Sequence, residues 1–241
     1  NKAAKLTVPS EAKIKNLLAA IDYKKIKVDI SKSEIYLQEK GMEIDLGGIA
    51  KGYAADRVIE VIRSQGIKAA LAAIAGDIKG FGLTPDLQGW KVGIQNPRPT
   101  GVRSIRLIGV DSYRDSEGQV DATRLRGSRV KEEDIFATLS LKDSAISTSG
   151  DYQRYFMENG KRFHHILDPQ TGYPAHGVIS VSIIAPDGYM TDGLSTGVFV
   201  LGVEKGIRLL ESMGIDGIIV DTENKISVTK NLEGKINIGN L

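Results

Sequence analysis

The stretch EIDLGGIAKGYAAD, residues 43–56, joins two segments whose apolar residues follow different periods. Before it, residues 25–30 and 34–38 are short and rich in Ile, Val and Tyr, which is typical of a β-hairpin, and a third strand is expected at 42–46. After it, apolar residues recur at helical spacing up to Gly66, which predicts a helix over residues 49–65. The stretch therefore predicts a strand, a glycine turn and a helix.

The rest of the chain adds more strands than helices. A helix is expected to end at Gly202, another to span 204–212, and Ser147–Gly150 is expected to be a polar turn. Strands are expected at residues 69–74, 78–81, 90–94, 136–141, 178–184, 217–221 and 225–228. Several neighbouring strands look antiparallel, so the sequence predicts an α+β fold of largely antiparallel strands with packed helices, in a single domain.

Composition excludes several classes of protein and site. The 241 residues carry 32 basic and 30 acidic side chains, a net charge of +2, which argues against a nucleic-acid partner. The absence of Cys excludes disulfides, thiolate zinc sites and cysteine nucleophiles, and is compatible with a protein outside the cytoplasm. The longest apolar run, residues 69–75, is shorter than the roughly 18 residues of a membrane helix.

The glycine turn is the first candidate site. Gly47 and Gly48 allow a tight turn in which backbone groups approach a ligand closely, and Lys51 adds a cation near the positively polarised start of the helix. Phosphate is the natural ligand of such a site. The alternative is an ordinary strand-to-helix turn with a surface lysine, because the stretch matches neither common nucleotide-binding motif.

The pair His164-His165 is the second candidate. If the chain is extended here, the two rings point to opposite faces, so they are not expected to bind one metal ion together. One of them can accept a proton from an attacking hydroxyl near neutral pH. The alternative is that both are structural or exposed.

Asp192 and Thr196 form the third candidate. Residues four apart share one face of a helix, so this carboxylate and this hydroxyl can converge on one hard cation such as Mg²⁺. A carbonyl, waters or substrate phosphates would complete the coordination. The alternative is a capping Asp followed by a small packing face.

Taken together, the sequence contexts of these candidates are specific. The runs EIDLGGIAKGYAAD (43–56), STSGDYQRYF (147–156) and HHILDPQTGYPA (164–175), followed by Asp192 and Thr196, resemble the ApbE family of flavin transferases over residues 25–219. The resemblance implies an ApbE-like fold and Mg²⁺-dependent transfer of FMN from FAD to a threonine of an acceptor protein, with release of AMP. Two alternatives stay open: an Mg²⁺-dependent FAD pyrophosphatase that yields FMN and AMP, and a non-catalytic flavin-binding protein of the cell envelope.

The resemblance also implies roles for individual residues. Mg²⁺ would be held by the backbone carbonyl of Gly48 with Asp192 and Thr196, and Ser195 would lie close enough to assist. FAD would contact Asp45, Lys51 and the backbone near Ile166. His165 would contact FAD and serve as the catalytic base that activates the acceptor threonine.

Partners and location follow from the same resemblance. The acceptor would be a protein with a threonine flavinylation motif, such as a redox-pump subunit or a flavin-binding domain. The expected location is the cell envelope, periplasmic or extracytoplasmic, with a lipid anchor upstream of Asn1. The family's N-terminal portion, which supplies part of the flavin pocket, is expected to be absent from residues 1–241.

Two departures from the family pattern remain. Ala75-Gly76-Asp77 stands where the family often has Gly-Gly-Asp, which matters only if that backbone needs a positive φ. Residues from about 97 to 135 are expected to be an exposed insertion, a lid or a docking loop for the acceptor. Within it, Thr123 follows a faint acceptor-like motif and is a candidate for self-flavinylation.

Overall fold

The structure of the protein is a computed structural model that describes residues 7–98 and 135–239. Within its α+β fold the chain forms two compact units. The smaller unit combines Asn1–Leu46 with Asp151–His176, and the larger combines Gly47–Gly150 with Gly177–Leu241. Each unit is described below by itself.

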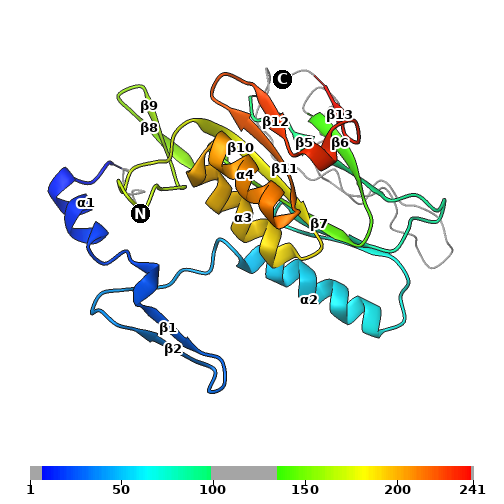
Figure 1. The fold of residues 1–241 in the computed structure, drawn as a ribbon, viewed down its shortest axis with the longest axis horizontal. Helices are drawn as coiled ribbons and strands as arrows, with labels where there is room; N and C mark the ends of the chain where they lie inside the picture. Colours follow the sequence, from blue (N-terminus) through cyan, green and yellow to red (C-terminus); the bar gives the residue numbers. More distant parts are fainter. Residues whose placement is uncertain (1–6, 99–134, 240–241) are drawn as a thin grey trace, which may run out of the picture. The chain divides into compact units, whose positions relative to one another are not determined.

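The larger unit is built on a six-stranded sheet with the strand order β12-β11-β10-β7-β4-β3 (Figure 1). Every pairing within it is antiparallel, which confirms the predicted fold class. Its strands are β3 (Ala70–Ile74), β4 (Asp77–Phe81), β7 (Ser144–Gly150), β10 (Val178–Ala185), β11 (Asp216–Asp221) and β12 (Ile226–Val228).

Three helices pack on this sheet: α2 (Ala50–Ser64), α3 (Gly188–Leu201) and α4 (Val203–Met213). Helix α2 contacts β3 and β4, α3 contacts β7 and β10, and α4 contacts β11. All three helices were predicted, and α2 ends as expected, with Gly66 in the left-handed conformation at φ 81°. Figure 1 shows the start of α2 beside α3, and this crossing carries the candidate site.

A second sheet completes the core of the larger unit. Its order is β13-β6-β5, from β5 (Trp90–Gln95), β6 (Ile135–Leu141) and β13 (Asn237–Ile238), and a short 3₁₀ helix spans Lys230–Leu232. Phe136 and Leu141 of this sheet are almost fully buried and cluster with Ile146 and Ile218 of the larger sheet. Burial of this apolar surface holds the two sheets together.

The smaller unit contains short elements. These are α1 (Glu11–Leu18), a 3₁₀ helix at Tyr23–Lys25, the hairpin of β1 (Ile26–Asp29) and β2 (Glu34–Leu37), and the hairpin of β8 (Tyr155–Glu158) and β9 (Lys161–His164). The β1–β2 hairpin was predicted, whereas α1 was not. Helix α1 begins at Ser10, whose side chain accepts the N–H of Lys13. None of the helices in residues 7–98 and 135–239 is long and apolar enough to cross a membrane.

Two local predictions were wrong. Residues 42–46 form no strand, although their apolar residues alternate, and Ile44 and Leu46 remain 41% and 59% exposed. Residues Ser147–Gly150 form no turn but the second half of β7, at the centre of the sheet. Their polar side chains indicated a turn, whereas the structure pairs them with the hydroxyls of neighbouring elements.

Candidate functional site

The start of helix α2 presents unpaired backbone N–H groups, as the first turn of every α-helix does. Its N-cap residue, Ile49, makes no side-chain capping bond. Instead, the N–H of Gly52 donates to Oδ2 of Asp192, on α3, at 3.1 Å. The positively polarised helix start therefore already faces a carboxylate of the neighbouring helix.

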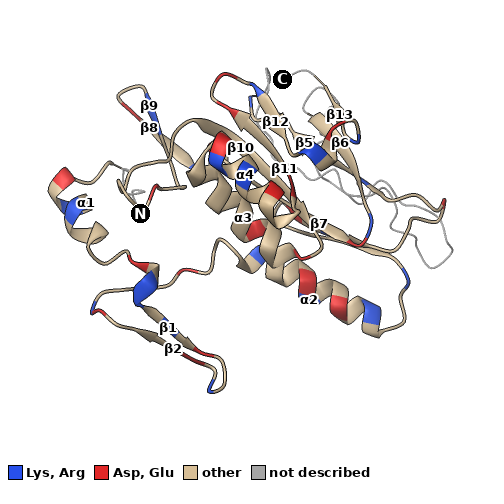
Figure 2. Ribbon diagram, in the orientation of Figure 1, with Lys and Arg blue, Asp and Glu red and all other residues tan. Residues whose placement is uncertain are grey.

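Lys51 joins two buried carboxylates at this point. Its Nζ donates to Oδ2 of Asp77 at 2.6 Å and to Oδ1 of Asp192 at 2.7 Å. The side chains of Asp77 and Asp192 are 5% and 4% exposed, whereas that of Lys51 is 37% exposed. In Figure 2 the blue first turn of α2 lies against red on α3. With one ammonium shared by two carboxylates, this cluster carries an excess of negative charge when both are ionised.

The titration of the cluster reflects this arrangement. Burial raises the pKa of Asp77 from its ordinary 3.8 to about 6, although the Lys51 hydrogen bond and charge lower it; the charge of Asp192 raises it further. Partial burial lowers the pKa of Lys51, but the hydrogen bonds and charges of Asp192 and Asp77 outweigh that effect and hold it above its ordinary value. Lys51 is therefore a permanent cation at neutral pH.

Asp77 was not among the predicted site residues, although Ala75-Gly76-Asp77 was identified as a departure from the family pattern. It is the first residue of β4, directly after the two-residue turn Ala75-Gly76 that joins β3 to β4. Both turn residues have positive φ, 48° at Ala75 and 108° at Gly76. Position 75 therefore needs a positive φ, and alanine in place of the family's glycine matters there, because an L-residue in this conformation is strained.

A chain of hydroxyl groups connects β7 to α3. Ser149 Oγ lies 2.8 Å from Ser195 Oγ and 3.1 Å from Thr196 Oγ1, and Ser195 Oγ donates to the carbonyl of Asp192 at 2.8 Å. With the Ser195 proton used in this way, Ser149 must donate to Ser195 and accept from Thr196. This direction leaves the lone pairs of Thr196 Oγ1 available to a cation.

The donors on α3 fit the predicted magnesium site. Asp192 supplies a buried carboxylate and Thr196, one helical turn later, a hydroxyl oxygen. Among the residues described, no three acidic or histidine side chains form a metal-binding group. Mg²⁺ does not require one, since it commonly takes one or two carboxylates and completes its shell with waters and phosphate oxygens.

Gly48, the third predicted ligand, lies in the exposed turn before α2. This turn packs on α3 beside Asp192, because a Cβ atom added to Gly193 would lie 3.2 Å from Cγ2 of Ile49. The larger unit thus brings Gly48, Lys51, Asp192 and Thr196 to one crossing of α2 and α3.

The two histidines lie in the smaller unit and face opposite sides, as predicted. His164 is 7% exposed, and its Nδ1 accepts the N–H of Ile166 at 3.3 Å while Nε2 lies 3.1 Å from the carbonyl of Ala175. The ring must therefore be neutral, with its proton on Nε2. Burial lowers the pKa of His164, although the Ala175 hydrogen bond raises it. His164 is a structural residue.

His165 has a different environment. It is exposed, and its Nδ1 lies 3.2 Å from the carbonyl of Arg154, an atom that can only accept. A neutral ring that donates from Nδ1 carries its lone pair on Nε2. His165 thus has the tautomer that a general base needs.

The neighbouring residues have clear structural roles. Ile166 is buried, its N–H donates to His164 and its carbonyl accepts the N–H of Ala175 at 3.0 Å. Asp168 accepts the N–H of Gln170 at 2.8 Å and shapes the following turn. Asp45 lies in an exposed, irregular segment of the smaller unit. Contacts of Asp45 and Ile166 with FAD stay predictions.

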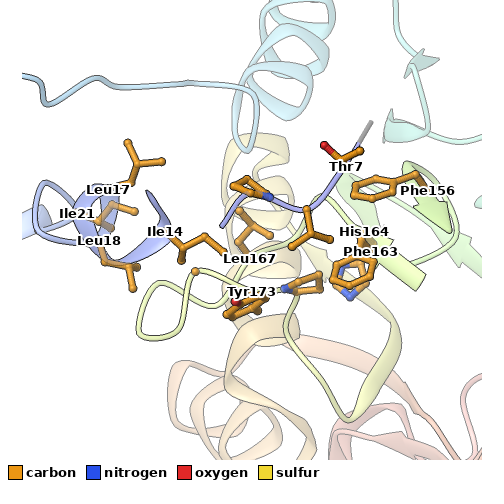
Figure 3. Close-up of a pocket in the computed structure, with 14 residues that line it drawn as sticks. Thr7, Ile14, Leu17, Leu18, Ile21, Phe156, Phe163, His164, Leu167 and Tyr173 are labelled. Atoms are coloured by element: carbon orange, nitrogen blue, oxygen red, sulfur yellow. The ribbon is translucent and has the colours of Figure 1, made fainter. Parts of the chain in front are cut away.

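The smaller unit also contains an apolar cavity of about 290 Å³. Figure 3 shows side chains of α1, among them Ile14 and Leu18, at one part of its wall and Phe156, Phe163 and His164 at another. Few polar groups line it, so the cavity suits an apolar or aromatic group. No sequence pattern pointed to it, because α1 was not predicted.

The predicted insertion, from about 97 to 135, lies almost entirely outside the described residues, and so does Thr123. Asp45, His165 and Ile166 belong to the smaller unit, and the other four predicted site residues belong to the larger one. The interpretation of residues 97–135 as a lid or docking loop stays a prediction.

Comparison with known proteins gives a consistent result. The family model of the ApbE family matches residues 1–219. A relative from Klebsiella pneumoniae, named FAD:protein FMN transferase, is 35% identical over 91% of this chain and 58% of its own length. A relative of the same name from Treponema pallidum is 30% identical over 96% of this chain and 59% of its own. The chain thus spans about three fifths of the length of these relatives.

Solved structures agree. The crystal structure of the ApbE protein from Thermotoga maritima matches with a TM-score of 0.76 and 33% identity, over 95% of this chain and 65% of that one. The flavinyl transferase ApbE of Pseudomonas stutzeri matches with a TM-score of 0.69 and 28% identity, over 95% and 62% of the two chains. The chain belongs to the ApbE family.

Proposed function

We propose that this protein transfers the FMN half of FAD to a threonine hydroxyl of an acceptor protein, with Mg²⁺, and releases AMP. The observation that carries this function is the cluster of Lys51, Asp77 and Asp192 at the start of α2. A cation, helix amides and buried carboxylates together suit a phosphate group with a bound divalent metal. The name FAD:protein FMN transferase of the relatives supports the choice of FAD.

Asp192 and Thr196 would hold the Mg²⁺, with the carbonyl of Gly48 as a further ligand. The excess negative charge of the cluster and the lone pairs of Thr196 favour a cation there. When bound, Mg²⁺ would neutralise charge on the pyrophosphate oxygens. Asp77, which is paired with Lys51, adds to the negative electrostatic potential that attracts Mg²⁺.

Lys51 and the first-turn amides of α2 other than that of Gly52, which donates to Asp192, would bind the pyrophosphate. Lys51 stays protonated because its two carboxylate partners raise its pKa, so it offers a fixed positive charge to the phosphate oxygens. Such preorganised charges stabilise a phosphoryl-transfer transition state without reorganising during the reaction.

His165 would act as the base. The threonine oxygen forms a bond to the phosphorus of the FMN half, the bond from that phosphorus to the bridging oxygen breaks, and AMP leaves with this oxygen. The proton of the threonine hydroxyl passes to Nε2 of His165, since Nδ1 is held by the Arg154 carbonyl. Water in place of the threonine would give hydrolysis to FMN and AMP.

The acceptor would carry a threonine flavinylation motif, as a redox-pump subunit or a flavin-binding domain. We further propose that the protein works in the cell envelope, on the extracytoplasmic side, held by a lipid anchor in its full-length form.

Gel fluorescence tests this function. The full-length protein is incubated with FAD, Mg²⁺ and an acceptor domain, and the acceptor band is examined for covalent flavin. We expect a fluorescent band that requires Mg²⁺ and the acceptor threonine, and that Asp192→Ala abolishes. AMP without such a band would indicate hydrolysis, and neither product would indicate a flavin-binding protein without catalysis.

His165 is tested in the same assay. His165→Ala should bind FAD as the parental protein does but transfer FMN slowly, by a factor of about 10² or more, as expected for loss of a general base. His176→Ala, an exposed histidine of the same unit, is the control. Transfer by His165→Ala at the parental rate would show that another group is the base.

A further inference from the structure

Helices α2 and α3 approach each other at a pair of glycines. A Cβ atom on Gly52 would lie 2.0 Å from the carbonyl oxygen of Gly188, and one on Gly188 would lie 2.5 Å from that of Gly52. Neither contact is possible for a real side chain, so both positions require glycine. This close approach brings the start of each helix within reach of side chains on the other.

At each helix start, one or two backbone N–H groups donate to a carboxylate of the other helix. Asp192, four residues after Gly188, accepts the N–H of Gly52 at 3.1 Å. Asp56, four residues after Gly52, accepts the N–H groups of Gly188 at 2.8 Å and Tyr189 at 3.0 Å. The two helices thus repeat one pattern, a glycine followed four residues later by an aspartate, and cap each other reciprocally.

The helices do not have a local substitute for these bonds. The N-cap residue of α3, Asp187, makes no side-chain capping bond, and neither does Ile49 at the start of α2. Each aspartate is also paired with a lysine, Asp192 with Lys51 and Asp56 with Lys79 of β4. Asp56 therefore fixes the first turn of α3 to both α2 and the sheet.

We propose that Asp56 is a positioning residue for Asp192. Asp56 holds the first turn of α3, and Asp192 lies one helical turn further along the same helix. Loss of the Asp56 bonds frees this first turn, so that Asp192 no longer reaches the amide of Gly52. The position of Asp192, the predicted metal ligand, therefore depends on the carboxylate of Asp56, which would not itself contact the metal.

Amide hydrogen exchange, measured by NMR on the full chain without ligand, tests this dependence. Asp56→Asn keeps the size of the side chain but removes the charge and one of the two acceptor oxygens. We expect exchange at Gly188 and Tyr189 to accelerate at least about ten-fold, because these two amides donate to different oxygens of Asp56 and only one uncharged acceptor oxygen remains in the variant. The decisive amide is that of Gly52, which Asp56 does not touch and which should accelerate by a similar factor.

Asp143→Asn is the matched control. Asp143 also accepts a backbone N–H, from Gly82 at 3.2 Å, and pairs with Arg63 of α2, away from the crossing. This variant should leave the Gly52 amide unchanged, and buried amides of β10 should be unchanged in both variants. Unchanged exchange at Gly52 in Asp56→Asn, with faster exchange at Gly188 and Tyr189, would mean that Asp56 is only a local cap.

A second measurement does not need the variant. In the parental protein, exchange at low urea concentrations should show Gly52, Gly188 and Tyr189 opening together, with one free energy and one dependence on urea. Opening of Gly52 at a lower free energy than the other two would overturn the role of Asp56. Both experiments are done without FAD, so their result is independent of whether the protein transfers FMN.

Discussion

Replacing Asp77 by asparagine is expected to stabilise the protein at neutral pH. The side chain is 5% exposed, and burial raises its pKa to about 6. At pH 7 the folded protein therefore holds a carboxylate whose ionised form is less favourable than in the unfolded chain. Asparagine has nearly the same shape and carries no charge, so it removes this cost.

The pKa shift sets the magnitude. The pKa rises from 3.8 to about 6, and each unit corresponds to about 1.4 kcal/mol, so the gain at pH 7 is at most about 3 kcal/mol. Between pH 3.8 and about pH 6 the folded protein binds more protons at Asp77 than the unfolded chain does. The free energy of unfolding of the parental protein therefore falls as the pH rises through this window, and the advantage of Asp77→Asn is present at pH 7 and small at pH 4.

Urea denaturation provides the assay. The single tryptophan, Trp90, lies in the same unit as Asp77 and donates to the carbonyl of Phe81, so its fluorescence reports the unfolding of this unit. Asp86→Asn, which changes an exposed carboxylate of the same unit, should show no such pH-dependent difference. A less stable Asp77→Asn at pH 7, or an equal difference at pH 4 and pH 7, would refute the reasoning.

Three further predictions concern stability. Ala75→Gly should raise the free energy of unfolding by about 1 kcal/mol, because Ala75 has a φ of 48°. Gly76→Ala should lower it. If urea denaturation shows Gly76→Ala to be the more stable of the two variants, the positive φ angles of this turn are contradicted. Gly52→Ala should destabilise the α2–α3 crossing, since its Cβ atom would lie 2.0 Å from a carbonyl oxygen; a parental thermal midpoint would contradict this contact. The protection of the Ile166 amide should fall only below pH 6.5, because burial lowers the pKa of His164 and the protonated ring no longer accepts this N–H; protection that already falls above pH 6.5 would contradict the neutral ring.

The contribution of His164 to the free energy of unfolding changes with pH in the opposite direction to that of Asp77. Burial lowers the pKa of His164, so below 6.5 the unfolded chain binds more protons than the folded protein. Stability contributed by His164 is therefore complete above pH 6.5 and is lost as the pH falls. His164→Gln should lack this loss, and His176→Gln, at an exposed position, should retain it.

Helices α2, α3 and α4 and most strands could be predicted because their signals are local. The spacing of apolar residues and Gly66 identified α2 with nearly correct bounds. The second half of β7 was missed because its hydroxyl groups look like those of a turn, whereas in the structure Ser147 pairs with Thr191 and Ser149 with Ser195 of α3. Contacts between distant residues override local preference there.

The candidate site shows the same limit. Lys51 and Asp192 were chosen from separate motifs, and the structure places them 2.7 Å apart. Asp77 and Asp56 were missed as site residues because their partners lie 26 and 132 residues away in the sequence. The signals for them were present: an aspartate directly after a two-residue turn, and the spacing Gly52–Asp56, which Gly188–Asp192 repeats. Neither signal identifies a site residue until the topology of the fold brings α2, α3 and β4 together.

The most direct test of the proposed reaction is the stoichiometry of its two products. The full-length protein is incubated with FAD, Mg²⁺ and an acceptor domain; intact mass gives the amount of acceptor that carries FMN, peptide mapping gives the residue, and an AMP assay gives the leaving group. We predict one AMP for each FMN attached to threonine, and neither product with Asp192→Ala. AMP in large excess over modified acceptor, or AMP formed at an equal rate by Asp192→Ala, would contradict this account.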